Sequence, residues 1–143
     1  GNIDLVRGRR LRRDGQPIEK SMETWRTGVE HYRHALQLAP NHYAAFGMMG
    51  LTYYEMGQYA EAKKAYERAI TINPHDYSTL TNLGNLYVKQ AELVRAQGGD
   101  GAAQLRLAEE YYRRSIQANS ARPQPVDGLK KIEEMRATFG IPK

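Results

Sequence analysis

The chain has 143 residues, of which 41% are hydrophobic and 26% are charged, and its formal net charge at pH 7 is +5. This length fits one domain of ordinary size with a continuous core, and the composition is that of a globular protein rather than a disordered one. No apolar run approaches the roughly 18 residues that a membrane-spanning helix needs, and the absence of cysteine excludes disulfides and thiolate metal sites.

Residues 1–17 form a basic segment that ends in turn-forming residues. Five of its residues are arginines within seven positions, namely Arg7, Arg9, Arg10, Arg12 and Arg13. Gly15 and Pro17 follow them and break a helix. The segment is too basic and too broken for a normal first helix, so we expect a flexible arm or linker here.

An amphipathic helix is predicted between residues 18 and 42. Apolar side chains recur along it every three or four positions and form one stripe, made up of Ile18, Met22, Trp25, Val29, Tyr32, Leu36 and Ala39. Because no regular helix is expected before it, this segment is predicted to be the second helix of a partial repeat.

Residues 43–76 contain the one complete copy of a repeat with a period of 34 residues. Several pairs of residues share this offset, namely Tyr32 with Tyr66, Ala35 with Ala69, Pro40 with Pro74, Gly50 with Gly84 and Tyr53 with Tyr87. Apolar residues recur at three and four positions on both sides of Gly57. The repeat is therefore predicted to be two amphipathic helices that reverse direction at this glycine.

The next repeat, residues 77–122, carries an insertion of 12 residues. Gly84 and Ala108 are 24 positions apart, whereas the equivalent glycine and alanine of the complete repeat are 12 apart. The turn residues are displaced to Gly98-Gly99-Asp100-Gly101. We expect both helices of this repeat to be lengthened, with the glycine turn at the tip and Asp100 capping the returning helix.

Residues 123–143 are predicted to be a capping helix that begins at about residue 124 and ends at about 138. The apolar side that would cover the end of the repeat stack comprises Val126, Leu129, Ile132 and Phe139. The side predicted to face water comprises Lys130, Lys131, Glu133, Glu134 and Arg136. An array of repeats needs such a polar cap.

The complete repeat resembles a tetratricopeptide repeat. The family pattern of an aromatic residue, Leu-Gly, Tyr, Ala, an aromatic residue, Ala and Pro is matched by Phe46, Met49-Gly50, Tyr53, Ala62, Tyr66, Ala69 and Pro74. Methionine in place of leucine is the departure. The resemblance implies an all-α fold, a right-handed α-α superhelix of about three repeats plus a C-terminal capping helix.

The resemblance also implies a binding groove, because in this family the first helices of the repeats line a concave surface that takes an extended peptide or a partner helix. Carried over by offset from Gly50 and Gly84, the groove positions are Ala44, Gly47, Leu51, Tyr54, Glu55, Ser78, Thr81, Asn85, Val88 and Lys89. Asn85 can hold a peptide amide by hydrogen bonds in both directions. A subset of the family grips C-terminal carboxylates, but Gly47 occupies one of the basic positions of that clamp, so chaperone-tail binding is not predicted.

The remaining polar residues do not converge on a catalytic or metal site. His31 and His34 are three positions apart, a spacing that metal sites use, but no cysteine or carboxylate cluster completes a site around them. The adjacent pairs Glu109-Glu110 and Glu133-Glu134 point about 100° apart on a helix and cannot act on one substrate atom. We therefore predict a chain that is not an enzyme and that binds no metal or cofactor.

The favoured function is a protein–protein interaction or scaffold module, and the start at Gly1 rather than Met suggests a piece of a longer protein. One alternative is that the five arginines bind an anionic membrane surface or nucleic acid, although sequence-specific reading of bases is not expected. Another is self-association through the exposed edge of the first repeat. The sequence names no partner and no compartment, and favours a cytoplasmic or membrane-associated location.

Overall fold

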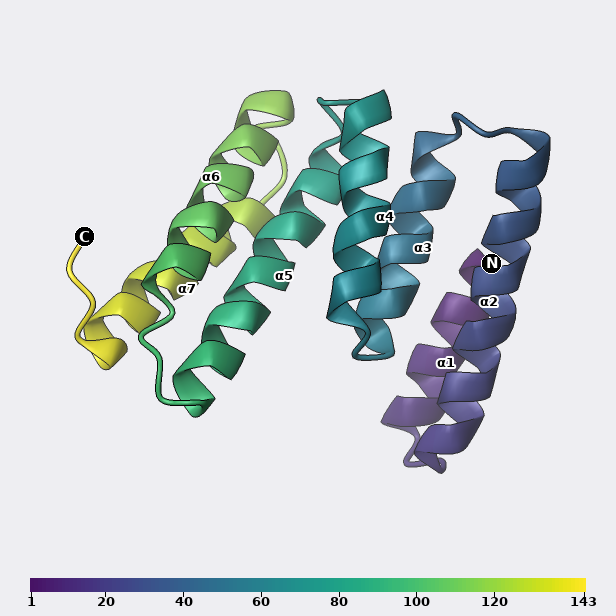
Figure 1. The fold of residues 1–143 in the computed structure, drawn as a ribbon, viewed down its shortest axis with the longest axis horizontal. Coiled ribbons are helices and arrows are strands. Elements are labelled where there is room, and N and C mark those ends of the chain that lie inside the picture. The colour runs from purple at the N-terminus through teal and green to yellow at the C-terminus, as the bar shows by residue number, and fades with distance from the viewer. The chain divides into compact units, whose positions relative to one another are not determined.

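A computed structural model describes residues 1–143 as seven α-helices without a β-strand (Figure 1). In chain order the helices are α1 (Asn2–Arg13), α2 (Ile18–Leu38), α3 (Tyr43–Glu55), α4 (Tyr59–Ile72), α5 (Tyr77–Ala96), α6 (Ala102–Ala118) and α7 (Gln124–Phe139). They fall into two compact units, Gly1–Pro74 with α1 to α4 and His75–Lys143 with α5 to α7. The predicted all-α fold is confirmed.

The first unit consists of two helical hairpins, since α1 packs against α2 and α3 packs against α4, while α2 also contacts α3. The second hairpin reverses at Gly57, as the sequence predicts. Its φ of +76° lies in the left-handed region that glycine adopts without steric cost. The N–H of Gly57 donates to the carbonyl of Tyr54, and the N–H of Gln58 donates to the carbonyl of Tyr53, so the end of α3 is capped.

Helix α1 takes the place of the flexible arm predicted for residues 1–17, so the first repeat has both of its helices. Leu5 is 2% exposed and Trp25 of α2 is completely buried. The indole N–H of Trp25 donates to the carbonyl of Leu5 over 3.3 Å. Gly8 allows this close approach, because a Cβ at that position would overlap the indole ring. The apolar stripe of α1 is short, but it is sufficient to hold this helix against α2, because the arginines of α1 are all exposed and none has to be buried.

The same contact between a glycine and an aromatic ring recurs in each hairpin. The pairs are Gly8 with Trp25, Gly50 with Tyr66 and Gly84 with Tyr112. A Cβ on Gly50 would lie 2.6 Å from a ring carbon of Tyr66, well inside van der Waals contact. These glycines therefore set how closely the two helices of a hairpin approach.

Where a tyrosine ring packs against a glycine, the next residue in the chain is in two cases an asparagine that binds the tyrosine hydroxyl. The hydroxyl of Tyr112 donates to Oδ1 of Asn85 over 2.7 Å in the second unit. In the first unit the ring of Tyr32 packs against Gly1, and its hydroxyl donates to Oδ1 of Asn2 over 2.6 Å. Burial raises the pKa of Tyr32 to about 12, with a further contribution from the nearby carboxylate of Asp4.

Leucine stands at the equivalent position of the complete repeat, where Leu51 follows Gly50. The hydroxyl of Tyr66 is buried there without a hydrogen-bond partner. Burial raises its pKa above the usual value, and the neighbouring Tyr54 and Glu55 raise it further. Leaving a buried hydroxyl unpaired costs about 1–3 kcal/mol. Leucine at position 51 therefore lowers the stability of this hairpin, because it offers the Tyr66 hydroxyl no hydrogen bond of the kind that asparagine makes in the other two places.

The second unit contains the long hairpin that the insertion predicts. Helices α5 and α6 have 20 and 17 residues, compared with 13 and 14 for α3 and α4. The chain reverses between Gln97 and Gly101, and Asp100 Oδ1 accepts a hydrogen bond from the N–H of Ala102 over 2.9 Å. The displaced glycines therefore mark the tip of this hairpin, and Asp100 caps the start of α6.

Helix α7 covers the second unit by packing on α6 and α5. Its buried side chains are Pro125, Ile132 and Met135. Val126, which was predicted to lie on the covering side, is instead 39% exposed. Because Pro125 starts the first turn and packs inward, the buried stripe runs through Pro125, Ile132 and Met135, and Val126 projects one residue away from it.

Candidate partner-binding surfaces

Most of the predicted groove residues on α3 are accessible, but one is not. Ala44 is exposed, and Leu51, Tyr54 and Glu55 are half-buried. The ring of Tyr54 meets that of Tyr59 on α4 edge to face, with 5.4 Å between their centres. Gly47 is buried, so the prediction that it lines an accessible groove does not fit the structure.

Glu55 joins α3 to α1, a contact that the sequence did not indicate. Its Oε1 accepts hydrogen bonds from Arg9, 2.9 Å from Nε and 2.6 Å from a terminal guanidinium nitrogen. Arg12 lies 3.9 Å from its other oxygen. Sequence reasoning placed the arginines and Glu55 in different sites because it predicted no helix before residue 18. Two guanidinium groups here face one carboxylate, which leaves a surplus of positive charge.

The other arginines of α1 point elsewhere. Arg10 and Arg13 are 73% and 78% exposed and lie 3.6 and 3.7 Å from the carboxylate of Asp14. Arg7 lines a hollow of about 460 Å³ between α1 and α2, together with Asp4. The five arginines are thus divided among three surroundings and do not form one continuous site.

The predicted groove residues on α5 also divide into two groups. Ser78 and Asn85 are exposed and Lys89 is half-buried. Thr81 and Val88 are 9% and 4% exposed, so the prediction that they line an accessible groove does not fit. The hydroxyl of Thr81 donates to the carbonyl of Tyr77 and forms a 2.7 Å hydrogen bond with the hydroxyl of Ser115 on α6, so it serves packing within the hairpin.

Helices α5 and α7 are joined in the same way as α1 and α3. Glu92 lies 3.2 Å from Nζ of Lys131 on α7 through one oxygen and 3.7 Å from Nζ of Lys89 through the other. Asn85 lies one helical turn before Lys89 on the same face. We refer to Asn85, Lys89, Glu92 and Lys131 as the α5–α7 face. It presents one amide and two ammonium groups around one carboxylate.

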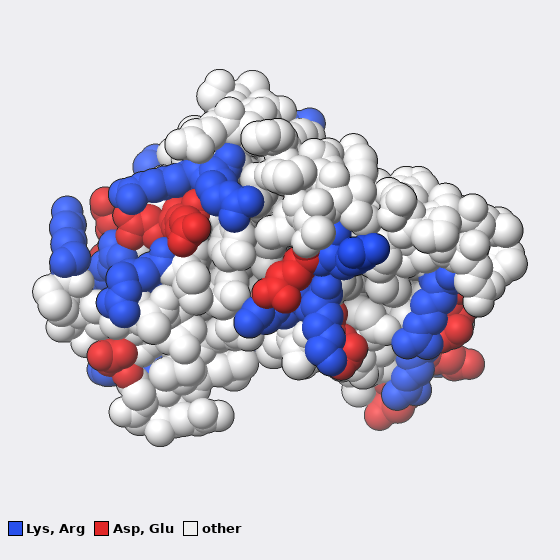
Figure 2. All heavy atoms as spheres, turned by 45° about the horizontal axis from the view of Figure 1, so that its top comes forward, with Lys and Arg blue, Asp and Glu red and all other residues white.

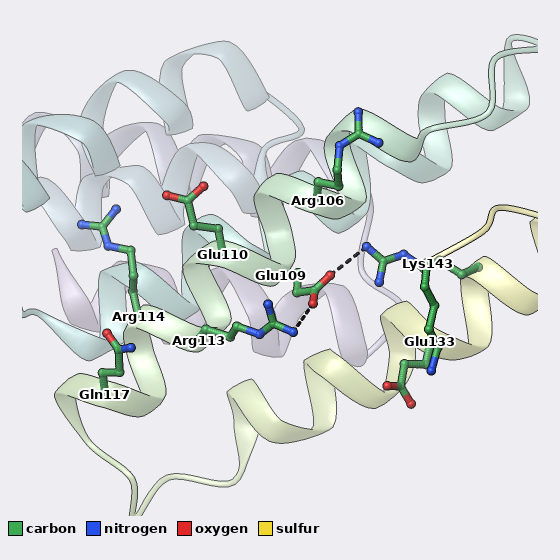
Figure 3. A pocket seen from close by; sticks show the side chains of 9 residues that line it. Arg106, Glu109, Glu110, Arg113, Arg114, Gln117, Glu133 and Lys143 are labelled. Carbon is green, nitrogen blue, oxygen red and sulfur yellow. Dashed lines mark hydrogen bonds and ion pairs between the residues drawn. The ribbon is translucent and has the colours of Figure 1, made fainter.

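A pocket of about 680 Å³ lies against α6 and α7 (Figure 3). Every lining residue except Gln117 is charged, and the lining comprises Arg106, Glu109, Glu110, Arg113, Arg114, Gln117, Glu133, Arg136 and Lys143. Arg113 contacts Glu109, and a guanidinium nitrogen of Arg136 lies 2.7 Å from the other oxygen of Glu109. Figure 2 shows acidic and basic side chains intermixed over this part of the surface, on the left of the view.

Two features of this pocket differ from or extend the sequence analysis. Arg136 was predicted to face water, but its side chain is only 12% exposed because it reaches across to Glu109. The six lining residues of α6 recur at intervals of three and four positions, which places them on one face of a helix. That spacing was the signal that could have revealed the pocket from sequence.

Two of the histidines, His31 and His42, take structural roles. His31 lies 2.8 Å from the carboxylate of Asp4 and thereby ties α2 to α1. Burial raises the pKa of Asp4, but hydrogen bonds from His31 and the terminal amino group outweigh this, so the pKa lies below its usual value. His42 accepts a hydrogen bond from the N–H of Ala45 at the start of α3. No group of three or more His, Asp or Glu side chains is placed to hold a metal ion.

None of the helices combines the length and the apolar character that crossing a bilayer requires.

Two family profiles, both described as tetratricopeptide repeat, match the chain, one over residues 43–76 and the other over residues 65–98. Among curated proteins, the "Uncharacterized protein ycf37" of Pyropia yezoensis is 38% identical over 52 residues. That match covers 36% of this chain and 29% of the relative, so it spans less than a third of the relative's length.

A solved tetratricopeptide domain shares the fold of this chain. The first tetratricopeptide domain of Spaghetti (RPAP3) has a TM-score of 0.66 at 13% identity, over 94% of this chain and 91% of that one. A structure described as a MamA RS-1 ArsTM double mutant covers 96% of this chain and 94% of its own at 14% identity, with a TM-score of 0.42. Residues 43–98 thus match the tetratricopeptide-repeat profiles, and the chain has the fold of a tetratricopeptide domain.

Proposed function

We propose that the chain is a non-enzymatic interaction module that binds an extended, acidic peptide on the α5–α7 face of its second unit. Tetratricopeptide repeats build binding surfaces for other proteins, which supports the general role. The observation that carries the specific site is the exposed amide of Asn85 next to two lysines that share one carboxylate.

The amide of Asn85 is oriented by the helix behind it. Tyr112 donates its hydroxyl hydrogen to Oδ1, so the Nδ2 group turns away from Tyr112. An NH₂ group in this position can donate to a backbone carbonyl of a bound peptide. Backbone hydrogen bonding of this kind holds an extended chain regardless of its side chains, and specificity then comes from neighbouring groups.

The neighbouring groups favour acidic side chains. Lys89 and Lys131 are 40% and 56% exposed and both contact Glu92, which is 38% exposed. One carboxylate cannot neutralise two ammonium groups, so a second carboxylate from a peptide would meet an attractive potential. Exposed ion pairs contribute only about 0.2–1 kcal/mol each, so we expect binding that is modest in affinity and sensitive to salt.

The α1–α3 face of the first unit, formed by Arg9, Arg12 and Glu55 with Tyr54 beside them, repeats the arrangement of two basic groups around one carboxylate. It is a second, separate place where a peptide can bind, with Tyr54 as an apolar contact. The similar structure of Spaghetti (RPAP3) was solved with the HSP90 peptide SRMEEVD. This supports peptide binding by a fold of this kind and does not identify the partner of this chain.

Peptides selected from a random displayed library against the intact chain should be enriched in Asp and Glu. Replacing both Asn85 and Lys89 by alanine removes one hydrogen bond to the peptide backbone and one ion pair, and should weaken the selected peptides about tenfold, or about 1.4 kcal/mol. Fluorescence anisotropy of labelled peptides measures the change, and Tyr54→Ala tests the first unit in the same assay.

The matched control is Lys64→Ala, which removes an equally charged side chain that is 75% exposed on α4. It should leave the affinity unchanged. If the Asn85→Ala/Lys89→Ala variant binds the selected peptides as tightly as the unchanged chain, the α5–α7 face is not the peptide site.

A second candidate function, binding to an anionic membrane surface, is favoured by the outer side of α1. Ile3 and Val6 are 82% and 64% exposed, and Arg10 and Arg13 follow them at helical spacing on the same side. An apolar start followed by basic side chains suits the boundary of anionic lipids. Nucleic acid offers no partner for the two apolar side chains.

Vesicles that contain phosphatidylserine should therefore carry the chain with them on sedimentation at low salt. Replacing Arg10 and Arg13 by glutamate should abolish this co-sedimentation, because it reverses the charge at the membrane surface. The control is Lys64→Glu on α4. Equal co-sedimentation of the Arg10→Glu/Arg13→Glu variant would rule out this role of α1.

A further inference from the structure

The charged face of α6 carries a regular alternation of sign. Arg106, Glu110, Arg113 and Gln117 follow one another at spacings of four, three and four residues, and all four are exposed. This spacing forms a straight stripe along a helix, of the kind through which a second helix packs alongside. Read along α6, the stripe is basic, acidic, basic and neutral.

Helix α2 carries a stripe with the same spacing and the opposite signs. Read from its C-terminal side, Glu30, Arg26, Glu23 and Glu19 follow one another at four, three and four residues, and all four are exposed. From this match we propose that the chain self-associates, with α6 of one copy packed antiparallel along α2 of a second copy.

The antiparallel direction brings unlike charges together at every charged position. It pairs Arg106 with Glu30, Glu110 with Arg26 and Arg113 with Glu23, and it leaves Gln117 to hydrogen-bond with Glu19. The parallel direction at the same spacing would place Glu110 against Glu23 and Arg113 against Arg26. Like charges in direct opposition disfavour that pairing, so the pattern specifies one direction.

The existing ion pairs of these side chains do not prevent the pairing. Arg113 is 67% exposed and contacts Glu109, which keeps Arg136 as a partner when Arg113 turns outward. Glu30 is 66% exposed and pairs with Arg33 within α2. Both side chains can therefore reach a second copy without leaving a buried charge uncompensated.

The alternation of sign also selects the kind of partner. A uniform polyanion or an anionic membrane laid along α6 would meet the carboxylates of Glu110 and Glu133 as well as the basic groups. A helix of mixed charge meets no such repulsion. Because the two stripes are different surfaces, the contact is heterologous. A pair of copies keeps α2 of one and α6 of the other free, so association proceeds beyond a dimer or closes into a ring.

Sedimentation velocity of the full chain, at concentrations up to about 1 mM, tests the proposal. At 0.1 M salt, where the screening length is about 10 Å, the average mass should rise with concentration. At 1 M salt, where that length is about 3 Å, it should return to the monomer. A chain that stays monomeric at both salt concentrations overturns the proposal.

Charge-reversal variants distinguish this specific contact from nonspecific association. The Arg113→Glu variant and the Glu23→Arg variant should each stay monomeric, because each places like charges across the contact. A mixture of the two should associate again, because glutamate at position 113 of one then faces arginine at position 23 of the other. The control Lys64→Glu should behave as the unchanged chain.

Either variant associating alone like the unchanged chain, or a mixture that stays monomeric, would overturn the pairing of α2 with α6. Helical content measured by circular dichroism confirms that each variant is folded. Peptide binding at Asn85 and Lys89 uses neither stripe, so its outcome is independent of this one.

Discussion

Replacing Trp25 by alanine should lower the free energy of unfolding by about 3–5 kcal/mol, the range for removing a large aromatic side chain from a core. Trp25 is completely buried and its indole N–H is hydrogen-bonded to α1. The substitution leaves a cavity between α1 and α2 that Gly8 cannot fill. Urea denaturation followed by circular dichroism measures the loss, which is large because domains of this size are stable by only about 5–15 kcal/mol.

The conservative control is Trp25→Phe, which keeps a ring in the cavity and loses the indole N–H. It should cost clearly less than Trp25→Ala. If both substitutions change the unfolding midpoint only slightly, α1 does not pack on α2, and the original expectation of a flexible basic arm would be correct.

This packing changes how the basic segment can be studied. Removing the first 16 residues would delete α1 and uncover Trp25 and Tyr32, which contact that segment and are buried in the intact chain. Loss of binding after such a deletion would then reflect lost stability. Substitutions at exposed positions such as Arg10 and Arg13 test the charge of α1 and leave its packing intact.

Replacing Gly84 by alanine should lower the free energy of unfolding by about 1–3 kcal/mol, the usual cost of overfilling a core. A Cβ on Gly84 would overlap the ring of Tyr112, and a Cβ on Gly128 of α7 would overlap the hydroxyl end of the same ring. The ring is held from both sides and is 2% exposed, so it cannot move aside. The loss appears even though alanine favours a helix by about 1 kcal/mol over glycine.

Ser78→Ala is the matched control on α5, because Ser78 is exposed, and it should change stability by no more than about 0.5 kcal/mol. A Gly84→Ala/Tyr112→Leu variant has a smaller side chain opposite the added Cβ. It should therefore be less destabilised than the sum of the two single substitutions predicts, because the two residues are in contact. Equal or higher stability of Gly84→Ala in urea denaturation would show that the glycine is not required for close approach of α5 and α6.

Periodicity predicted the central part of the fold well. The 34-residue offset between Gly50 and Gly84 identified equivalent helices, and the displaced glycines before Ala102 located the tip of the long hairpin. These signals are local, since a turn residue or a helical stripe is read from a few neighbouring positions. The helices from α2 onward follow them closely.

The sequence predicted the structure less well where a contact between residues far apart in the chain decides the outcome. Helix α1 has only a narrow apolar stripe among many arginines, and the indole of Trp25 supplies the surface that holds it, which no local pattern reveals. Likewise, an offset from Gly84 placed Thr81 and Val88 in the groove, although the packing of this hairpin buries both. The ion pair between Arg136 and Glu109 joins residues 27 positions apart and depends on how α7 lies on α6.

The candidate site combines both kinds of information. Asn85 and Lys89 were predicted from the repeat, whereas Glu92 and Lys131 enter the α5–α7 face only through the packing of α7. The hydrogen bond from Tyr112 then sets which atoms of the Asn85 amide face outward. A tightly packed glycine, a tyrosine and an asparagine thus connect the core of the second unit with its proposed binding surface.

Mapping a selected acidic peptide by backbone amide chemical shifts tests the proposed peptide binding most directly. The account predicts that titration moves the resonances of Asn85, Lys89, Glu92 and Lys131, and that the Nδ2 protons of Asn85 shift with them as the peptide carbonyl accepts their hydrogen bond. Shifts confined to other helices, with these four residues unmoved while the peptide is bound, would contradict it.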